Sequence, residues 1–444
     1  MTLLVEKRKQ IPPEETTVLI PEARLRKRRR RLRIGVIVIM VGAIVLLASI
    51  YVGGLGNRPL THPSASTASS NGSVAVLPVG TIINASSVVA IQMFSPTRGV
   101  AISTFWSRSY QKIEHSYLTM TNNGGISWRV EGMLPTGTSS PNFSWNPLLA
   151  FFTPRMGYIA TSSPRSFRFT SNGGRTWSNV AVPGIPTALW ISSGQLLATS
   201  ERCSNMSGAP NCGATFLNVV RPGSLTASRD SRIPSVLPKS NSLGTTSSAY
   251  PATVIAWHQS TGVMVENHLS SLHGAHLLAT ANSGVTWHPL INPCPQGGQP
   301  LGQAISDSDW YFMCSAGVGM NKATNWLYRT DNAGHTWTLL AQGSLFGHNI
   351  GNIGVMSVSS FGVSKDGRYV WINGGPGFLE YSADGGRHWR FVGQHGLIPG
   401  AKTNILGPYF TSVGHDAWMP ILFGGLARTT NGASWKVVGE SSFP

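Results

Sequence analysis

Acidic side chains are scarce in this sequence, where 17 Asp and Glu stand against 34 Lys and Arg in 444 residues. The first 33 residues hold 11 basic and 4 acidic side chains, which leaves 23 and 13 for the rest. So few carboxylates leave few groups whose protonation could destabilise a fold, which predicts tolerance of an acidic exterior. With 41% hydrophobic and only 11% charged residues, the chain is too apolar to be a disordered tail, and a large folded core is expected.

Motifs of the common enzyme classes are also missing. The sequence has no Walker loop, GxSxG elbow, HExxH or dinucleotide fingerprint. Asp307 and Asp309 could form a carboxylate pair, but a solvated turn before Trp310 is the favoured interpretation. Enzymatic activity is therefore disfavoured, and no cofactor is expected.

A histidine-rich stretch raises the question of a metal site. No carboxylate or cysteine stands at ligand spacing nearby except Glu266, and residues three apart on a strand point to opposite faces. A metal site is disfavoured on both grounds. The histidines are His258, His268, His273, His276 and His288.

Cysteine is rare, with four residues in two local pairs. Cys203 with Cys212 and Cys294 with Cys314 predict two disulfides in an exported domain. Free or metal-bound thiols are the alternative, although neither spacing resembles CxxC zinc chemistry.

One long apolar run occurs near the N-terminus. Residues 34–52 (IGVIVIMVGAIVLLASIYV) carry no charge over 19 positions, about the length of helix that crosses a bilayer core. A cleaved signal peptide is the rival interpretation, but no A-x-A pattern follows closely. The basic residues just before the run keep the N-terminus in the cytoplasm and also suit anionic lipid headgroups. They include Arg28, Arg29, Arg30, Arg31 and Arg33.

These features divide the chain into four parts. We expect a cytoplasmic, basic and largely disordered tail at 1–33, a transmembrane helix at 34–52, a Ser/Thr/Gly/Pro stalk at 53–73 and an extracytoplasmic folded domain at 74–444. This predicts a single-pass cell-membrane protein. No nucleic-acid partner is expected.

A short phrase recurs through the predicted folded domain: TNNGGISW, TSNGGRTW, TANSGVTW, TDNAGHTW, SADGGRHW and a degenerate TTNGASW. The intervals between their Trp residues are 49, 110, 50, 52 and 46, so one copy is missing from the long interval, near residues 225–235. In each phrase an Asx side chain can bond backbone amides and Gly can take positive φ, which predicts structural turns before a strand. The turn residues are Asn123, Gly125, Trp128, Asn172, Gly174, Trp177, Asn282, Gly284, Trp287, Asn332, Gly334, Trp337, Asp384, Gly386, Trp389, Gly432 and Trp435.

A second phrase precedes the first by some 20–35 residues, as in MFSPTRGVAIS and FFTPRMGYIAT. It contains a strand, a polar turn and another strand. Two hairpins per unit give four strands, so we predict an all-β, seven-bladed propeller of four-stranded antiparallel blades. The segment near residues 74–90 is expected to close the ring by pairing with the last blade.

The first phrase resembles the Asp-box, or bacterial neuraminidase repeat, and the repeat length is most similar to that of photosystem II assembly and stability factors. Sialidases are better-known relatives of this superfamily. The resemblance implies turns at the outer rim of the blades, away from any catalytic centre. Arg232-Ile233-Pro234 matches a sialidase tripeptide but falls in the unit that lacks the phrase, which disfavours a functional role.

The leading hypothesis is a membrane-anchored, non-catalytic scaffold that binds a protein partner outside the cytoplasm. The alternative is a carbohydrate-directed propeller, either a sialidase-like glycoside hydrolase or a glycan-binding protein.

Overall fold

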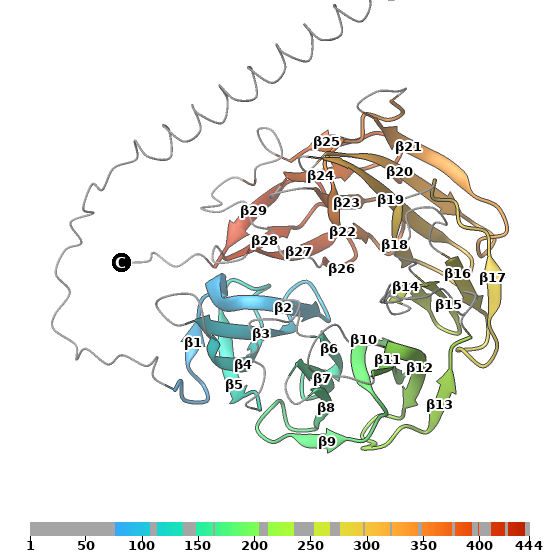
Figure 1. Cartoon of the computed structure of the whole chain (residues 1–444). Coiled ribbons are helices and arrows are strands. Elements are labelled where there is room, and N and C mark those ends of the chain that lie inside the picture. Colours follow the sequence, from blue (N-terminus) through green and yellow to red (C-terminus); the bar gives the residue numbers. More distant parts are fainter. Residues whose placement is uncertain are drawn as a thin grey trace, which may run out of the picture. The chain divides into compact units, whose positions relative to one another are not determined.

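The part of the chain that can be described in the computed structural model forms seven antiparallel sheets (Figure 1). The predicted tail, membrane helix and stalk lie outside it. Within it, no helix is both long and apolar enough to cross a membrane. The described residues are 76–106, 113–135, 148–162, 165–203, 212–234, 253–266, 276–295, 298–319, 322–344, 349–374, 378–392, 398, 410–421 and 425–439.

Each sheet is a blade of four consecutive strands, and blade 1 has a fifth strand and a short 3-10 helix, η1 (Ala85–Ser87). Blade 1 contains β1 (Ile82–Ile83), β2 (Val88–Met93), β3 (Gly99–Trp106), β4 (Ile113–Thr121) and β5 (Trp128–Met133). Blade 2 contains β6 (Leu148–Thr153), β7 (Met156–Ser162), β8 (Arg165–Thr170) and β9 (Ser178–Val180). Blade 3 contains β10 (Ile185–Ser192), β11 (Gln195–Cys203), β12 (Cys212–Val220) and β13 (Arg229–Arg232).

Blades 4 to 7 continue in the same order, and the prediction of a seven-bladed propeller with four-stranded blades is confirmed. Blade 4 contains β14 (Thr253–His258), β15 (Thr261–Glu266), β16 (His276–Thr280) and β17 (His288–Leu290), and blade 5 contains β18 (Gln299–Ala304), β19 (Trp310–Gly319), β20 (Lys322–Thr330) and β21 (Thr338–Gly343). Blade 6 contains β22 (Val358–Val363), β23 (Val370–Gly374), β24 (Phe378–Ser382) and β25 (Arg390–Phe391). Blade 7 contains β26 (Thr411–Val413), β27 (Asp416–Ile421), β28 (Gly425–Thr429) and β29 (Trp435–Val438).

The second strand of a blade is apolar on both faces because each blade is sandwiched between two others. On β19, Tyr311 and Met313 pack in the cluster shared with blade 6, whereas Trp310 and Phe312 pack in the cluster shared with blade 4. All four are at most 1% exposed. This period of two is the side-chain alternation of a strand.

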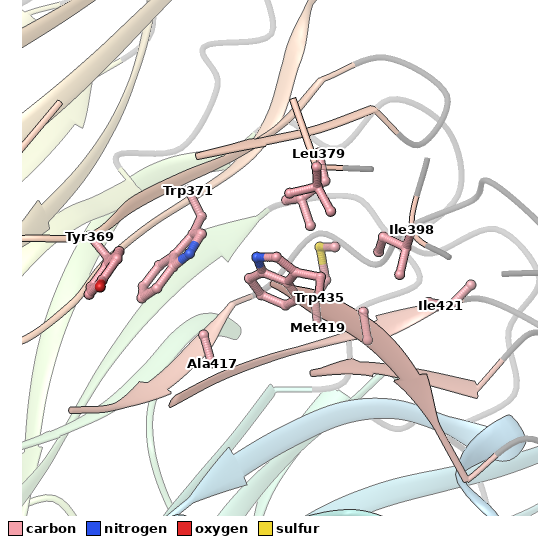
Figure 2. Close-up of a cluster of buried hydrophobic side chains, with 10 residues drawn as sticks. Tyr369, Trp371, Leu379, Ile398, Ala417, Met419, Ile421 and Trp435 are labelled. Carbon is pink, nitrogen blue, oxygen red and sulfur yellow. The ribbon is translucent and has the colours of Figure 1, made fainter. Parts of the chain in front are cut away.

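The core consists of seven separate hydrophobic clusters, one for each junction between adjacent blades. Figure 2 shows the cluster between blades 6 and 7, where Trp435 lies between Trp371 and the side chain of Met419. The two tryptophan rings meet edge to face with centroids 6.2 Å apart, a favoured aromatic geometry. Stability therefore comes from the contact between neighbouring blades as much as from each sheet.

The ring closes differently from our expectation. β1 pairs antiparallel with β5 of its own blade, and Ile82 lies opposite Arg129, so the predicted strand pairing with the last blade is wrong. Blade 7 already contains four strands of its own and has no vacant position for another. Blades 1 and 7 instead meet through packing and isolated hydrogen bonds, including Ala85 N to Gly439 O at 2.9 Å and Trp418 Nε1 to Gly124 O at 2.9 Å.

Blade 3 lacks the repeated phrase and uses a longer connection, residues 221–228, between β12 and β13. This connection reaches back to blade 2, where Ala181 N donates to Leu225 O at 2.8 Å. The buried Tyr158 of β7 donates its hydroxyl to the carbonyls of Arg221 (3.1 Å) and Ser224 (2.9 Å). The missing copy is thus replaced by a segment that is fixed by the preceding blade.

Candidate partner-binding face

One end of the propeller is built from two turns of each blade, the turn from first to second strand and the turn from third to fourth strand. We call this end the turn face. The two turns of one blade are joined by backbone hydrogen bonds, such as Gly124 N to Thr97 O (2.9 Å) and Gly173 N to Arg155 O (2.8 Å). Equivalent bonds in blades 4, 5 and 6 place their turns on the same face.

The turn from third to fourth strand is the repeated phrase, and its hydrogen bonds recur. In blade 1, Thr121 Oγ1 donates to Asn123 Oδ1 (2.9 Å) and accepts from Gly125 N (3.0 Å). Asn123 Oδ1 also accepts from Ser127 N at 3.0 Å. The same pattern is centred on Asn172, Asn282, Asn332 and Asp384.

The last copy is one residue shorter, and Asn431 Oδ1 accepts from Ala433 N (3.0 Å) and Ser434 N (2.8 Å). Its Gly432 has φ +75°. An amide oxygen and a carboxylate oxygen accept the same backbone donors, so Asn and Asp serve this turn equally.

The glycine two residues after the Asn or Asp of five of the phrases has two reasons to be glycine. Gly386 has φ +92°, and a Cβ there would come within 2.2 Å of Leu327 Cδ2 in the preceding blade. Equivalent contacts join Gly174 to Leu118 and Gly284 to Leu217, while Gly125 and Gly334 meet Leu426 and Leu290. These turns therefore lock each blade against the one before it.

The Trp residues that end the phrases differ in burial. Trp128, Trp389 and Trp435 are buried between blades, while Trp177, Trp287 and Trp337 are half-buried. Trp128 Nε1 bonds Gly125 O (3.1 Å) and Trp389 Nε1 bonds Gly386 O (2.9 Å) within their own turns.

The predicted disulfide between Cys294 and Cys314 is present, with Cα atoms 5.5 Å apart. It ties the connection after β17 to β19. Cys203 lies opposite Cys212 in the register of β11 and β12, but their side chains lie outside the described part.

The aspartates of the turn face lie in blades 5 to 7, and several have a His or Arg neighbour. Asp307 accepts from Thr261 Oγ1 (2.8 Å) and lies 2.9 Å from His258 Nδ1. Although partial burial raises its pKa, these hydrogen bonds outweigh that effect and lower it. Asp309 instead binds Arg329 through two hydrogen bonds of 2.8 and 2.6 Å. The two carboxylates have separate partners, as expected of turn residues.

A second His–Asp pair joins blades 6 and 7. His415 Nε2 lies 2.8 Å from Asp366 Oδ2, and Ser364 Oγ donates to the other oxygen at 2.6 Å. Burial raises the pKa of Asp366, but these bonds and the Arg368 amide lower it to about 2. Asp384 behaves alike: burial raises its pKa, and bonds from the His388 amide and ring and from Ser382 lower it to about 2.

Arginines without a carboxylate occupy the turn face of blades 1 to 3. Arg98, Arg155, Arg175 and Arg221 are exposed, and the turns of these three blades contain no Asp or Glu. Within the described residues, these four guanidinium groups make no hydrogen bond or ion pair. We call them the arginine arc.

The arc was not among the sequence predictions. Its members come from three blades, with Arg155 and Arg175 in the two turns of blade 2, and only the propeller brings all these turns to one face. A sequence signal existed in SPTRG, TPRMG and NGGRT, since each places Arg at the same end of a hairpin.

Three glutamates of the described residues are buried, and two of them, Glu201 and Glu380, lack the arginine partner that Glu131 has in Arg129. Burial raises the pKa of Glu201 to about 7, and its Oε1 has no hydrogen-bond partner among the described residues. Burial also raises the pKa of Glu380, and a 2.8 Å bond from Gly354 N acts in the opposite direction, which leaves a pKa of about 7.

The remaining sequence candidates are dispersed. Ile233 is buried in the junction of blades 3 and 4 while Arg232 is exposed. His288 is exposed on β17, and His268 and His273 lie outside the described residues. In the described ranges, no three His, Cys, Asp or Glu side chains gather as a metal site.

No protein-family profile matches the sequence, and no curated protein matches it either. Solved structures of similar fold include YCF48 bound to D1 peptide, at 15% identity and a TM-score of 0.47, covering 80% of this chain and 97% of that one. YCF48 from Cyanidioschyzon merolae is similar at 13% identity and 0.48, covering 79% and 98%. A polysaccharide lyase, the PL25 ulvan lyase, is similar at 9% and 0.49, covering 80% and 94%. At these scores the fold assignment rests on the seven sheets themselves.

Proposed function

We propose that this chain is a membrane-anchored, non-catalytic scaffold that binds an acidic segment of a protein partner outside the cytoplasm. The observation that carries the proposal is the arginine arc: exposed arginines in turns that contain no Asp or Glu. Planar guanidinium groups pair well with carboxylates. The apolar run at residues 34–52 and the basic segment before it support the anchor and the orientation.

The distribution of charge favours the arc over the rest of the turn face. In blades 5 to 7 the basic side chains stand beside Asp307, Asp309, Asp366 and Asp384, so an acidic partner meets repulsion there. Fixed positive charge in blades 1 to 3 attracts it and speeds encounter.

The test is affinity purification of the tagged full-length protein from gently solubilised native membranes. The variant is Arg98→Gln/Arg155→Gln/Arg175→Gln, and the control removes the same charge from blade 6 of the same face: Lys365→Gln/Arg368→Gln/Arg387→Gln. We expect partner proteins to be enriched by the wild type and the control and lost from the arc variant.

Equal enrichment by all three proteins would refute the arc as the binding surface. Co-elution of a glycan, unchanged by the arc variant, would favour the carbohydrate-directed alternative instead.

A further inference from the structure

The outer edge of blade 1 gathers exposed aliphatic side chains. Val76, Val79, Ile82, Ile126 and Met133 are between 44% and 63% exposed, and they are five of the ten large hydrophobic side chains of the described residues that are at least 42% exposed. The others are scattered over blades 3 to 6. Single exposed aliphatic residues are ordinary, but a concentration on one edge indicates an interaction site.

Hydrogen bonds place the segment that carries Val76, Val79 and Ile82 beside β5, where Met133 lies and which Ile126 shortly precedes. Gly80 N donates to Val130 O at 2.8 Å, which continues the pairing of β1 with β5. Leu77 N donates to Tyr117 Oη at 2.9 Å, and Tyr117 lies opposite Met133 in the register of β4 and β5. Ile126 belongs to the turn directly before β5. The segment 76–83 therefore runs along β5 on the outside of the blade (Figure 1).

The accessible charge around this edge is positive. Arg129 of β5 has a side chain that is 57% exposed, while its partner Glu131, 2.6 Å away, is only 8% exposed. Lys436 is exposed on β29 of blade 7, and Gly439, just beyond β29, accepts the hydrogen bond from Ala85 N. Aliphatic side chains flanked by Lys and Arg are typical of surfaces that enter the headgroup region of anionic membranes.

The chain before Val76 leads directly to the predicted anchor. Residues 53–75 link the described propeller to the predicted anchor and number 23, and a Gly/Ser-rich linker of 23 residues spans about 25–30 Å on average. A tether this short keeps the first described edge close to the bilayer to which the chain is attached, so a weak surface interaction becomes effectively intramolecular.

We infer that the outer edge of blade 1 rests on the anionic lipid surface in which the chain is anchored. The inference rests on the membrane anchor of the proposed function and is independent of the arginine arc. The propeller then stands edge-on, and the turn face opens to the side, where a membrane-embedded partner can reach the arc.

The test uses the full chain in lipid nanodiscs and a nitroxide label. Ile82→p-acetylphenylalanine carries the label through its ketone, so the disulfide is untouched. Ile291→p-acetylphenylalanine is the matched control, because Ile291 is 71% exposed but lies in blade 4 after β17. Power saturation in the presence of O₂ and of a water-soluble nickel chelate measures the depth of each label.

We expect the ratio of O₂ to nickel accessibility at position 82 to rise severalfold in nanodiscs with anionic lipid, and much less with zwitterionic lipid. The label at position 291 should stay at the value for water. The double variant Val79→Asp/Ile82→Asp should remove lipid-dependent protection of backbone amides in β1 from hydrogen exchange.

Water-like accessibility at both labels would overturn the inference. Dipolar broadening between labels that appears only with two proteins per nanodisc would also overturn the inference, because it would show that a second copy of the chain covers the edge. Protein that fails to co-purify with nanodiscs contradicts the anchor, whereas anchored protein with a water-exposed position 82 contradicts only the docking of the edge.

Discussion

Single residues at the repeated turns carry contacts between blades. Gly386 combines a positive φ with a position where a Cβ would lie 2.2 Å from Leu327. Gly194 has φ +69° but no atom within 4 Å of an added Cβ. The two glycines separate backbone strain from packing between blades.

We predict that Gly386→Ala lowers the free energy of unfolding by about 3 kcal/mol, from left-handed backbone strain and overpacking together. Gly194→Ala should cost about 1 kcal/mol, from strain alone. Urea unfolding of the full-length protein measures both. Equal losses would show that the contact with Leu327 is unimportant.

Buried carboxyls predict a stability maximum in acid. Burial raises the pKa of Glu201 and Glu380 to about 7, above the ordinary value of 4.5, so their protonated forms favour the fold. This contribution is complete below about pH 4.5 and is lost as the pH rises through 7. Asp366 and Asp384, with pKa values lowered to about 2, favour the fold above about pH 4 and lose this contribution as the pH falls toward 2.

The melting temperature of the full-length protein should therefore peak near pH 4–5 and fall toward both pH 8 and pH 2. Glu380→Gln should flatten the decline between pH 5 and pH 8, because Gln has no proton to lose. A maximum at pH 7–8 would contradict this balance of charges.

The elements follow the sequence where hairpins carry local signals. The phrase MFSPTRGVAIS became the end of β2 and the start of β3, and FFTPRMGYIAT became the hairpin of β6 and β7, because turn residues and alternating apolar residues determine such pairs locally. The 294–314 disulfide was also predictable from its spacing. Ring closure was not, since nothing local distinguishes pairing of β1 with β5 from pairing with β29.

The connection that replaces the repeated turn in blade 3 depends on one side chain of blade 2. Tyr158→Phe removes the donor to two backbone carbonyls, and we predict a loss of about 1–3 kcal/mol. Tyr381→Phe is the control, since its half-buried hydroxyl makes no hydrogen bond within the described residues. Similar losses in thermal or urea unfolding would contradict the role of Tyr158.

On the scale of the whole molecule, the ring is joined at one place where the blades are not consecutive in sequence. Blades 7 and 1 meet through a hydrophobic cluster and the bond from Trp418 Nε1 to Gly124 O. Trp371 makes the same kind of bond, to Gly432 O at 2.7 Å, between consecutive blades 6 and 7. These two tryptophans allow a matched comparison.

We predict that Trp418→Phe increases amide hydrogen exchange in β2 and β29 by at least tenfold, because opening there is not restrained by a direct chain connection. Trp371→Phe should produce a smaller, local increase. Equal effects at the two junctions would show that closure between blades 7 and 1 is no weaker than the others.

The arginine arc exists only at this scale, because its residues come from three blades whose turns the ring places on one face.

The most direct measurement of the central claim is binding of a fluorescent, Glu- and Asp-rich 20-residue peptide to the full-length protein, followed by anisotropy at several salt concentrations. We predict that Arg98→Gln/Arg155→Gln/Arg175→Gln weakens binding at least tenfold and reduces its salt dependence, while Lys365→Gln/Arg368→Gln/Arg387→Gln leaves the affinity within twofold. Equal affinity of both variants, or no binding by the wild type, would contradict the account.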